Sequence, residues 1–376
     1  MVKISLIEKR IEPNESPVMV TGTIVGSFLL ALIIGGFLLL PYGANPIEAY
    51  GTMISESLGD IRGIGNTLIR ATPLIFIGLG TIVAWSSGFF YLGFEGTLLV
   101  GAAMTVWVAL ETAEGGFIGP LAPLVFFPIV FVASFIAGGL WATIVGILRS
   151  RFGGNEVIVS LMFNYVAIFL INYLVSFPLR AEGDLPQTAR IPEATILSTI
   201  IPGTRAHSGI LVALVITFVV WVFLNKTRIG YEIVAAGLSP RAARYGGINV
   251  GNRQVLASFI AGGLGAWAGL VIVLGVQYRL MEGISQGTGF VGIVAALLGA
   301  LKPLGVVIAS LLYAAMGVGA DVMQRRMGLP SSVIFIVQGL IVLFVLASNI
   351  LRYYRINWSV LRRGGVDLSS TVEPEE

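Results

Sequence analysis

The feature that most constrains the fold of this chain is a series of long apolar segments that recurs along almost its whole length. About 20 apolar residues in an α-helix match the roughly 30 Å hydrocarbon core of a bilayer. Backbone groups in lipid must be hydrogen-bonded internally, so the sequence predicts an all-α integral membrane protein with about ten transmembrane helices. The segments are residues 18–40, 66–85, 94–111, 118–147, 156–178, 208–225, 255–276, 288–301, 303–323 and 331–350.

Three of these segments need separate comment. The segment 288–301 is short for a full crossing, so it is expected to be a span, a half-helix or a re-entrant element. The segment 118–147 is long enough to tilt, or to begin with an interfacial piece before Pro123. The first segment is too long for a signal-peptide core and lacks a clear small-residue cleavage site, which predicts a retained first helix.

Composition supports a membrane protein and excludes several classes of chemistry. Only 11% of residues are charged, against about a quarter in a soluble domain, and no cysteine is present. Cysteine nucleophiles, disulfides and thiolate metal sites are therefore excluded. His207, the single histidine, is expected to be a solvated loop residue, and neither a catalytic residue nor a metal site is expected. The net charge of +3 lies in loops, so no nucleic-acid partner is expected.

The distribution of lysine and arginine predicts the orientation of the chain, because cytoplasmic loops carry the excess of both. The prediction places residues 1–17 and 351–376 in the cytoplasm, with one transmembrane domain at 18–350, an external loop at 179–207 and a cytoplasmic loop at 226–254. The residues expected on the inner side are Lys3, Lys9, Arg10, Arg149, Arg151, Lys226, Arg228, Arg241, Arg244, Arg253, Lys302, Arg352, Arg355, Arg362 and Arg363.

A short internal echo suggests a repeat. Gly93-Phe94-Glu95-Gly96 opens the third segment and Gly289-Phe290-Val291-Gly292 opens the eighth, and each is followed by an aliphatic run that ends in Gly-Ala. These two segments run in opposite directions in the predicted topology, as an inverted repeat relating helices 2–5 to helices 7–10 requires. Chance is the alternative, because four-residue matches are common in a chain with 48 glycines.

Two glycine-containing stretches, 86–93 and 286–290, are candidate helix interruptions. Most glycines in such a chain let helices pack closely, but glycine beside an interruption can free backbone groups to face a cavity. Both stretches also carry aromatic and hydrogen-bonding side chains that suit stacking on a ring and orienting it. Candidate residues of a solute path are therefore Phe90, Tyr91, Gln286 and Phe290.

Two carboxylates and one polar stripe extend this set. Glu95 has two interpretations: it lines a translocation path, or it links helix ends through hydrogen bonds. Glu156 follows Gly-Gly-Asn at a helix start, where helix capping is the favoured interpretation. In the fifth segment Tyr165, Asn172 and Ser176 share one helix face, and Asn164 lies about 100° away. These side chains either join helices or form a polar cavity wall.

The cytoplasmic loop carries a short helix with strong start and stop signals. Ser239 supplies the N-cap and Pro240 the first position, and a pair of glycines follows Tyr245. Two helical turns are marginal in water, so this helix needs something to dock against. It either lies on lipid headgroups or couples to a soluble motor subunit. The coupling residues would be Gly237, Ser239, Pro240, Arg241, Ala243, Arg244, Tyr245 and Gly246.

From about residue 65 to residue 348 the chain resembles a known family. The sequence motifs on which the resemblance rests are Phe-Tyr-Leu-Gly-Phe-Glu-Gly at 90–96, Gly-Asn-Glu-Val-Ile at 154–158 with Met-Phe-Asn-Tyr at 162–165, Lys-Thr-Arg-Ile-Gly at 226–230, the 235–248 segment, Gly-Phe-Val-Gly-Ile-Val-Ala-Ala-Leu-Leu-Gly at 289–299, Pro330, and Gln-Gly-Leu at 338–340. Their order and spacing resemble the permease subunits of ATP-binding-cassette (ABC) importers for simple sugars, nucleosides and branched-chain amino acids. The segment at 155–158 and the long external loop are most similar to nucleoside-type permeases.

The resemblance implies a subunit of the cell (inner) membrane that is not an enzyme and that moves a small polar solute by alternating access. It implies cytoplasmic ATPase partners that bind ATP and Mg, a second permease that is identical or homologous, and an extracytoplasmic solute-binding protein. Tyr91 and Thr97 replace the asparagine and glutamine that are common in the family, which leaves the ligand open.

Alternatives to a nucleoside or sugar importer stay open. One is a branched-chain amino acid permease, and another is an ion-coupled secondary carrier with Glu95 as its coupling group. No Gly-x-x-x-x-Gly-Lys-Ser/Thr phosphate loop occurs in the chain, so the motor of an ABC importer has to be a separate protein. An intramembrane enzyme ranks last, because the chain has neither a His-Glu-x-x-His run nor a serine–histidine dyad.

Overall fold

The computed structural model describes residues 7–9, 17–113, 116–119, 121–328, 333, 336–340, 342–344, 347 and 354–356. It divides into two compact units, one formed by Met1–Glu48 with Leu329–Glu376 and the other by Ala49–Gly328. Most of the predicted tenth segment, 331–350, lies outside the described residues, as do most of the two predicted cytoplasmic ends.

The first unit contains helix α1 (Pro17–Leu39), which is followed by a 3-10 turn at Leu40–Tyr42. Strand β1 (Ile7–Lys9) pairs with strand β2 (Tyr354–Ile356) in an antiparallel ladder with Glu8 opposite Arg355. This small two-stranded element departs from the all-helical prediction. It brings segments from near the two ends of the chain side by side.

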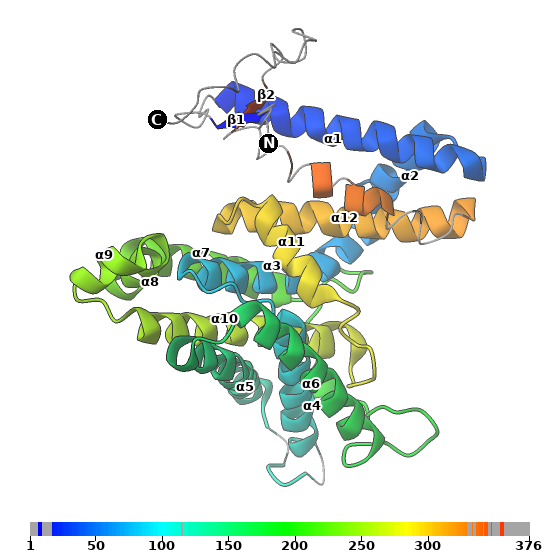
Figure 1. Ribbon diagram of the computed structural model, residues 1–376. Helices are drawn as coiled ribbons and strands as arrows, with labels where there is room; N and C mark the ends of the chain where they lie inside the picture. Colours follow the sequence, from blue (N-terminus) through cyan, green and yellow to red (C-terminus); the bar gives the residue numbers. More distant parts are fainter. Residues whose placement is uncertain are drawn as a thin grey trace, which may run out of the picture. The chain divides into compact units, whose positions relative to one another are not determined.

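The second unit is built from helices joined mostly by short connections (Figure 1). The helix α10 continues into a π-helical turn at Val273–Gln277, and a 3-10 turn lies at Glu193–Thr195. The helices are α2 (Pro46–Leu58), α3 (Ile61–Ser86), α4 (Phe94–Glu111), α5 (Pro123–Phe152), α6 (Glu156–Ser176), α7 (Gly209–Lys226), α8 (Arg228–Leu238), α9 (Pro240–Tyr245), α10 (Val250–Ile272), α11 (Thr288–Leu298) and α12 (Pro303–Met327).

Seven helices of the described part are long and apolar enough to cross a membrane: α3–α7, α10 with its π turn, and α12. The count rises to eight if the interrupted pair Leu29–Tyr42 and Pro46–Leu58 forms one span. Helix α11 has 11 residues, which at about 1.5 Å per residue is too short to cross, so a full span at 288–301 is wrong and the half-length alternative is confirmed. Helices α2 and α8 were not predicted, since neither contains a long apolar run.

Local capping explains where several helices begin and end. Asp60 caps α3 by accepting from Ile61 N, and Asn249 caps α10 by accepting from Asn252 N. At α6 the capping side chain is Asn155, whose Oδ1 accepts from two backbone N–H groups. The prediction that Glu156 caps this helix is therefore wrong, because its carboxylate turns aside to pair with Arg149 at 3.0 Å.

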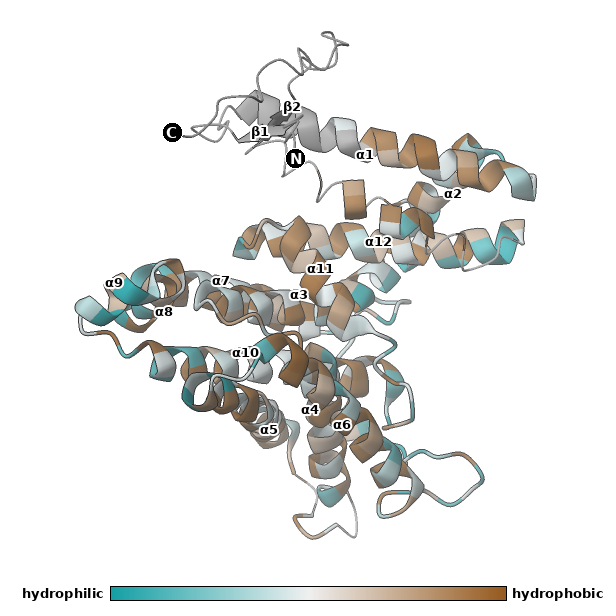
Figure 2. Ribbon diagram, viewed as in Figure 1, coloured by the Kyte–Doolittle hydropathy of each residue, from teal (hydrophilic) through white to brown (hydrophobic). Residues whose placement is uncertain are grey.

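The core of the second unit is centred on α3 and α10, which pack against each other. Their most extensive other contacts are reciprocal: α10 packs on α5 and α4, whereas α3 packs on α12 and α11. Small residues allow these contacts, since a Cβ on Gly262 would collide with the Gly138 carbonyl and one on Gly269 with the Leu98 carbonyl. The predicted role of glycine in close helix packing is confirmed at these positions. Figure 2 shows largely hydrophobic residues along α4, α5 and α6.

Candidate functional site

The chain between α3 and α4, residues 87–93, is the first break, and it folds back into the core. Gly88 takes a left-handed conformation with φ 73°, which glycine tolerates without strain. The buried rings of Phe89, Tyr91 and Phe94 then pack in series, with centroids 5.7 and 5.1 Å apart. The Tyr91 hydroxyl donates to the Gly93 carbonyl at 3.0 Å. Within this chain Tyr91 therefore supports the break from inside, whereas Phe90 is half exposed and packs on Trp85.

Helix α6 supplies the polar groups that hold the first break in place. Asn164 is buried, and its Nδ2 donates to the Leu92 carbonyl at 3.0 Å while its Oδ1 accepts from Gly96 N at 2.8 Å. Ser160 Oγ accepts from Leu92 N at 3.2 Å. One amide thus satisfies backbone groups on both sides of the start of α4. This matches the helix-joining alternative for Asn164.

Glu95 lies in the first turn of α4 and is only 5% exposed. Its Oε1 accepts from Gly287 N at 3.0 Å and its Oε2 accepts from Gly289 N at 2.8 Å. Both donors belong to the N-terminal end of α11, where the helix dipole favours an anion. A Cβ on Gly289 would collide with the Glu95 backbone, so the contact depends on glycine. Glu95 therefore links two helix starts, as the linking interpretation expected.

The chain between α10 and α11, residues 278–287, is the second break. Tyr278, Gln286 and Gly287 all have positive φ angles, of 59°, 47° and 76°, so this connection contains several left-handed turns. Gln286 in this break and Phe290 in the first turn of α11 are both exposed. The two glycine-containing stretches predicted as interruptions do flank helix starts, and Glu95 brings them together.

Residues 179–207, which we call the external cap after the location that the sequence predicts for them, pair with the second break and with the π turn before it through backbone hydrogen bonds. Thr188 N donates to the Leu280 carbonyl at 3.0 Å, Ile191 N donates to the Tyr278 carbonyl at 2.9 Å, and Leu197 N donates to the Leu274 carbonyl at 3.0 Å. The Arg190 guanidinium lies 5.2 Å from the centroid of the Tyr278 ring. The long loop is thus attached to the segment that leads into α11.

His207, at the end of the external cap, is buried rather than solvated, which corrects the prediction from the sequence. Its Nδ1 accepts from Gly209 N at 3.2 Å, and its ring fills the space left by the missing side chain of Gly275. Burial lowers the pKa of His207 from 6.5 to about 4. A loop position alone could not reveal this, because the contact joins residues far apart in sequence.

The outer face of α6 carries the remaining path candidates. Tyr165 is 64% exposed, and Asn172 Nδ2 donates to Glu282 Oε1 of the second break at 3.1 Å. Asn164 points into the core instead. The eight candidate residues therefore divide into a buried group and a group at or near the surface. Tyr91, Glu95 and Asn164 form the buried group, and Phe90, Tyr165, Asn172, Gln286 and Phe290 form the other.

The short helix predicted in the cytoplasmic loop is confirmed as α9, Pro240–Tyr245. Ser239 Oγ accepts from Ala242 N at 3.4 Å, and Gly247 supplies the left-handed turn after the helix with φ 81°. Sequence reasoning missed α8, whose signal was the N-cap Thr227, which accepts from Gly230 N at 3.0 Å. We call helices α8 and α9 together the cytoplasmic module, after the location that the sequence predicts for this loop.

The cytoplasmic module is fixed to α10 on one side and exposed on the other. Glu232 pairs with Arg228 at 2.9 Å and with Arg253 of α10 at 2.5 Å, and the hydrogen bond from Arg228 leads the causes that lower the pKa of its carboxyl group. Ala243 is buried against Ala236 and Val250. Figure 2 shows hydrophilic residues on α9. The exposed residues of the module include Leu238, Pro240, Arg241, Arg244, Tyr245 and Gly246.

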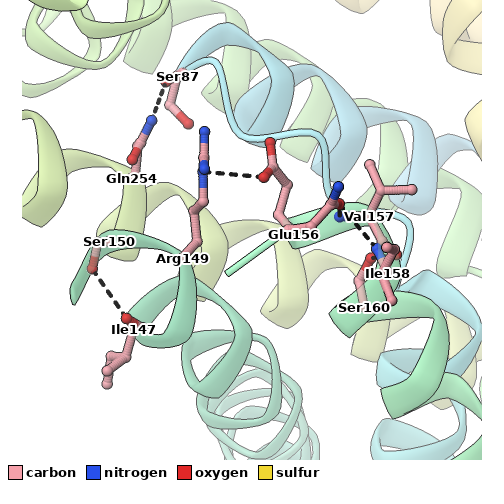
Figure 3. A network of polar contacts seen from close by, with 10 residues as sticks. Ser87, Ile147, Arg149, Ser150, Glu156, Val157, Ile158, Ser160 and Gln254 are labelled. Carbon is pink, nitrogen blue, oxygen red and sulfur yellow. Dashed lines mark hydrogen bonds and ion pairs between the residues drawn. The ribbon is translucent and has the colours of Figure 1, made fainter. Parts of the chain in front are cut away.

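A close backbone contact joins the cytoplasmic module to the first break. A Cβ on Gly237 would collide with the Ser86 carbonyl, and one on Gly88 would lie 3.3 Å from Gly237 Cα. Gln254 Nε2 donates to the Ser87 carbonyl at 3.4 Å. Figure 3 shows this bond beside the Arg149–Glu156 ion pair, so ends of α3, α5, α6 and α10 meet here. The structure therefore explains why Gly237 is a glycine.

These features define a multi-pass membrane protein whose broken helices meet in a buried junction held by hydrogen bonds to Glu95 and Asn164. Residues 63–346 match the model of the family described as the permease component of the branched-chain amino acid transport system. The chain belongs to this family and supplies the permease component of an ABC transporter rather than its ATPase.

Several curated relatives match over nearly the whole chain. A glucose ABC transporter permease protein of Haloferax volcanii is 33% identical, covering 91% of both chains. A guanosine ABC transporter permease protein of Bacillus subtilis is 35% identical over 87% of this chain and 93% of its own length. A nucleoside ABC transporter permease protein of Lactococcus lactis is 29% identical over 85% and 88%. No solved structure matches the chain.

Proposed function

We propose that this chain is the permease subunit of an ABC importer of the cell membrane that takes up nucleosides. The observation that carries the proposal is the 35% identity, over 87% of the chain, to a guanosine permease, supported by the nucleoside permease of Lactococcus lactis. A simple sugar is the second candidate, favoured by the glucose permease that covers 91% of the chain. Alternating access moves the solute, and ATP and Mg are bound by separate ATPase subunits.

The proposed topology has both termini in the cytoplasm and relates helices 2–5 to helices 7–10 by an inverted repeat. Exchanging α3 with α10, α4 with α11 and α5 with α12 reproduces the reciprocal packing of the core, which supports the repeat. The pairing of β1 with β2 supports placing both ends on one side of the membrane. The basic residues of the cytoplasmic module support assigning that side to the cytoplasm.

The proposed solute path runs along the exposed polar and aromatic side chains near the two breaks and on the outer face of α6. Tyr165 lies about 13 Å along α6 from its start, where a hydroxyl facing lipid would have no partner. A water-filled path or a neighbouring subunit would supply a hydrogen-bond partner for this hydroxyl. Phe90, Tyr165, Asn172, Gln286 and Phe290 are proposed to face the solute, while Tyr91, Glu95 and Asn164 shape the path from behind.

The proposed partners are a pair of cytoplasmic ATPases, a second permease and an extracytoplasmic solute-binding protein. The exposed α9, with Arg241, Arg244 and Tyr245 on its surface, suits a groove on an ATPase. Two guanosine ABC transporter permease proteins of one Bacillus subtilis strain both match this chain, which supports a heterodimer. The external cap is proposed to receive the solute-binding protein.

The test is uptake by the assembled complex in proteoliposomes, with guanosine, glucose and leucine as radiolabelled solutes. ATP-dependent accumulation of guanosine but not of the others is expected, whereas glucose uptake alone would select the second candidate. An ATPase variant that cannot hydrolyse ATP should abolish uptake. Continued uptake with that variant, together with sensitivity to an uncoupler, would refute the ABC importer and favour an ion-coupled carrier.

A single-cysteine experiment tests the orientation, because the chain has no native cysteine. Glu182→Cys in the external cap and Tyr245→Cys in α9 are both exposed positions. A membrane-impermeant maleimide added outside intact cells should label only the first. Labelling of Tyr245→Cys under these conditions would refute the proposed topology.

A further inference from the structure

We infer that Glu95 is a positioning residue that joins the cytoplasmic module mechanically to the external cap during transport. The inference rests on the proposed function and names the buried group through which a movement on one side of the membrane reaches the other. It depends on three contacts. The cytoplasmic module contacts the first break, Glu95 contacts the start of α11, and the external cap contacts the second break.

The central contact is the double hydrogen bond from α11 to the Glu95 carboxylate. The two donors, Gly287 N and Gly289 N, lie 3.0 and 2.8 Å from different oxygens of one side chain. Glu95 is nearly inaccessible to solvent, so water cannot replace either partner without opening the core. A displacement of α4 relative to α11 would therefore leave buried backbone groups unpaired, and the two helix starts are expected to move together.

The contact on the cytoplasmic side joins the first break to the module. Gly237 of α8 lies against the backbone of Ser86 and Gly88, with no room for a side chain on Gly237 and only a tight fit for one on Gly88. The module is also tied to α10 by the Glu232–Arg253 pair, and Gln254 of α10 reaches the Ser87 carbonyl. A displacement of the module must therefore push the first break, which leads within seven residues to Glu95.

The contact on the opposite side joins the second break to the external cap. Backbone hydrogen bonds from residues 188, 191 and 197 to residues 280, 278 and 274 extend the cap along the segment before α11. Leu280 N also donates to Thr188 Oγ1 at 3.0 Å. The helix start bound by Glu95 is thus continuous with a segment that is fixed to the cap.

The hydrogen bonds that Glu95 accepts from Gly287 N and Gly289 N join the chain after the first break to the start of α11. The first break is also held by α6, Gly237 and Gln254, and the second by the external cap and Asn172. Without the Glu95 hydrogen bonds, the second break should no longer respond to a movement of the cytoplasmic module. The other contacts of each break should stay intact. A purely structural role would instead lower the amount of assembled complex without changing how one side responds to the other.

The experiment measures the response of the second break to nucleotide bound on the ATPase. Gln286→Cys gives the cysteine-free chain one exposed thiol beside α11, and an impermeant maleimide in the external solution reports its accessibility. The complex with its ATPases is labelled with and without ATP trapped by an ATPase variant that cannot hydrolyse it. With native Glu95 the labelling rate should change about fivefold, the low end of typical coupling between sites.

Glu95→Gln keeps the size of the side chain but replaces one acceptor oxygen with an NH2 group that faces a backbone N–H. This variant should still copurify with the ATPases, and trapped ATP should no longer change the labelling rate. Gly289→Ala, which displaces α11 from Glu95, should have the same effect. The matched control is Glu111→Gln at the other end of α4, because Glu111 Oε2 also accepts from a backbone N–H, that of Phe117, at 3.0 Å.

The control should keep the fivefold response. A normal response in Glu95→Gln would overturn the inference, and so would a Gln286→Cys thiol that ignores nucleotide in a complex that transports solute. ATP-dependent uptake by the native complex is measured in the same preparation. Its absence would refute the proposed function itself, which distinguishes that failure from a failure of the Glu95 link.

Discussion

The two breaks interrupt helices on either side of one carboxylate, yet they are held in different ways. The first break is filled by aromatic rings and satisfied by α6, with Asn164 bonded to both Leu92 and Gly96. The second break has more left-handed residues and exposed side chains and is supported by the external cap, whose His207 packs on the π turn just before this break. The first break is thus a rigid part of the core, whereas the second is fixed mainly by loop contacts.

The largest expected effect comes from removing the support of the first break. Asn164→Ala leaves a buried N–H and a buried carbonyl unpaired, which should cost about 3 kcal/mol because each such group costs about 1–3 kcal/mol. The matched control is Asn172→Ala on the same helix, whose single bond to Glu282 lies near the surface. Thermal unfolding of the purified chain should separate the two variants clearly. Equal losses would mean that the first break is no more rigid than the second.

A fall in pH should weaken the contact between His207 of the external cap and the π turn before the second break. The pKa of His207 is about 4 in the folded chain against about 6.5 when unfolded, so the unfolded state binds more protons between these values. Stability is therefore complete above about pH 6.5 and falls as the pH drops through this window. At pH 5 the loss should reach about 2 kcal/mol, since each pKa unit corresponds to about 1.4 kcal/mol.

The measurement compares unfolding at pH 7 and pH 5 for the native chain and for His207→Gln, which cannot be protonated. The variant should lose about 2 kcal/mol less than the native chain over this interval. Identical pH dependence in both proteins would show that His207 is accessible to protons without opening the external cap.

A pair of glycines tests how tightly each break is packed. Gly88 and Gly287 both have left-handed φ angles, of 73° and 76°, but only Gly88 has a backbone atom of another helix within reach of an added Cβ. Alanine at Gly287 should cost about 1 kcal/mol from the backbone conformation alone. Alanine at Gly88 should cost about 1 kcal/mol more through overpacking against Gly237. Indistinguishable unfolding temperatures would argue against the contact with the cytoplasmic module.

The smallest expected change in stability is at the surface of the module. Arg244→Glu reverses an exposed charge on α9 and should alter the free energy of unfolding by less than about 0.5 kcal/mol. It should nevertheless reduce copurification of the ATPase, because the reversed charge lies on the proposed docking face. Ala243→Pro, in the buried face of this helix, should cost about 3 kcal/mol and act through the fold. Normal ATPase binding by both variants would move the docking site elsewhere.

Much of the fold follows from patterns within single segments. Long apolar runs identified the spans, and Ser239, Pro240 and the glycines after Tyr245 identified α9, because capping depends on residues next to each other. The same kind of count marked 288–301 as short for a full crossing, with a half-helix among the alternatives, and the structure selects the half-length. Helices α2 and α8 were missed since amphipathic helices of 13 and 11 residues do not stand out among apolar runs.

The candidate site was predicted less completely, because its residues interact across the sequence. Apolar surroundings indicated that Glu95 would be buried or face a cavity, and hydrogen-bonded linking was one of two interpretations. Its partners Gly287 and Gly289 lie 192 and 194 residues away, and no local pattern identifies them. The exposed and buried members of the candidate path could not be separated either, since helical spacing gives a direction but not the identity of the neighbour.

The sequence by itself determined that this chain is a helical, cysteine-free membrane protein with interrupted helices and a short capped helix at residues 240–245, because hydropathy, capping and composition are properties of neighbouring residues. Only the tertiary structure decided that Tyr91 and Asn164 support the first break from inside, that His207 is buried, that Asn155 and not Glu156 caps α6, and that Gly237 lies against Gly88. Each of these features depends on which side chains and backbone groups meet when the helices pack. A sequence pattern within one segment does not contain that information.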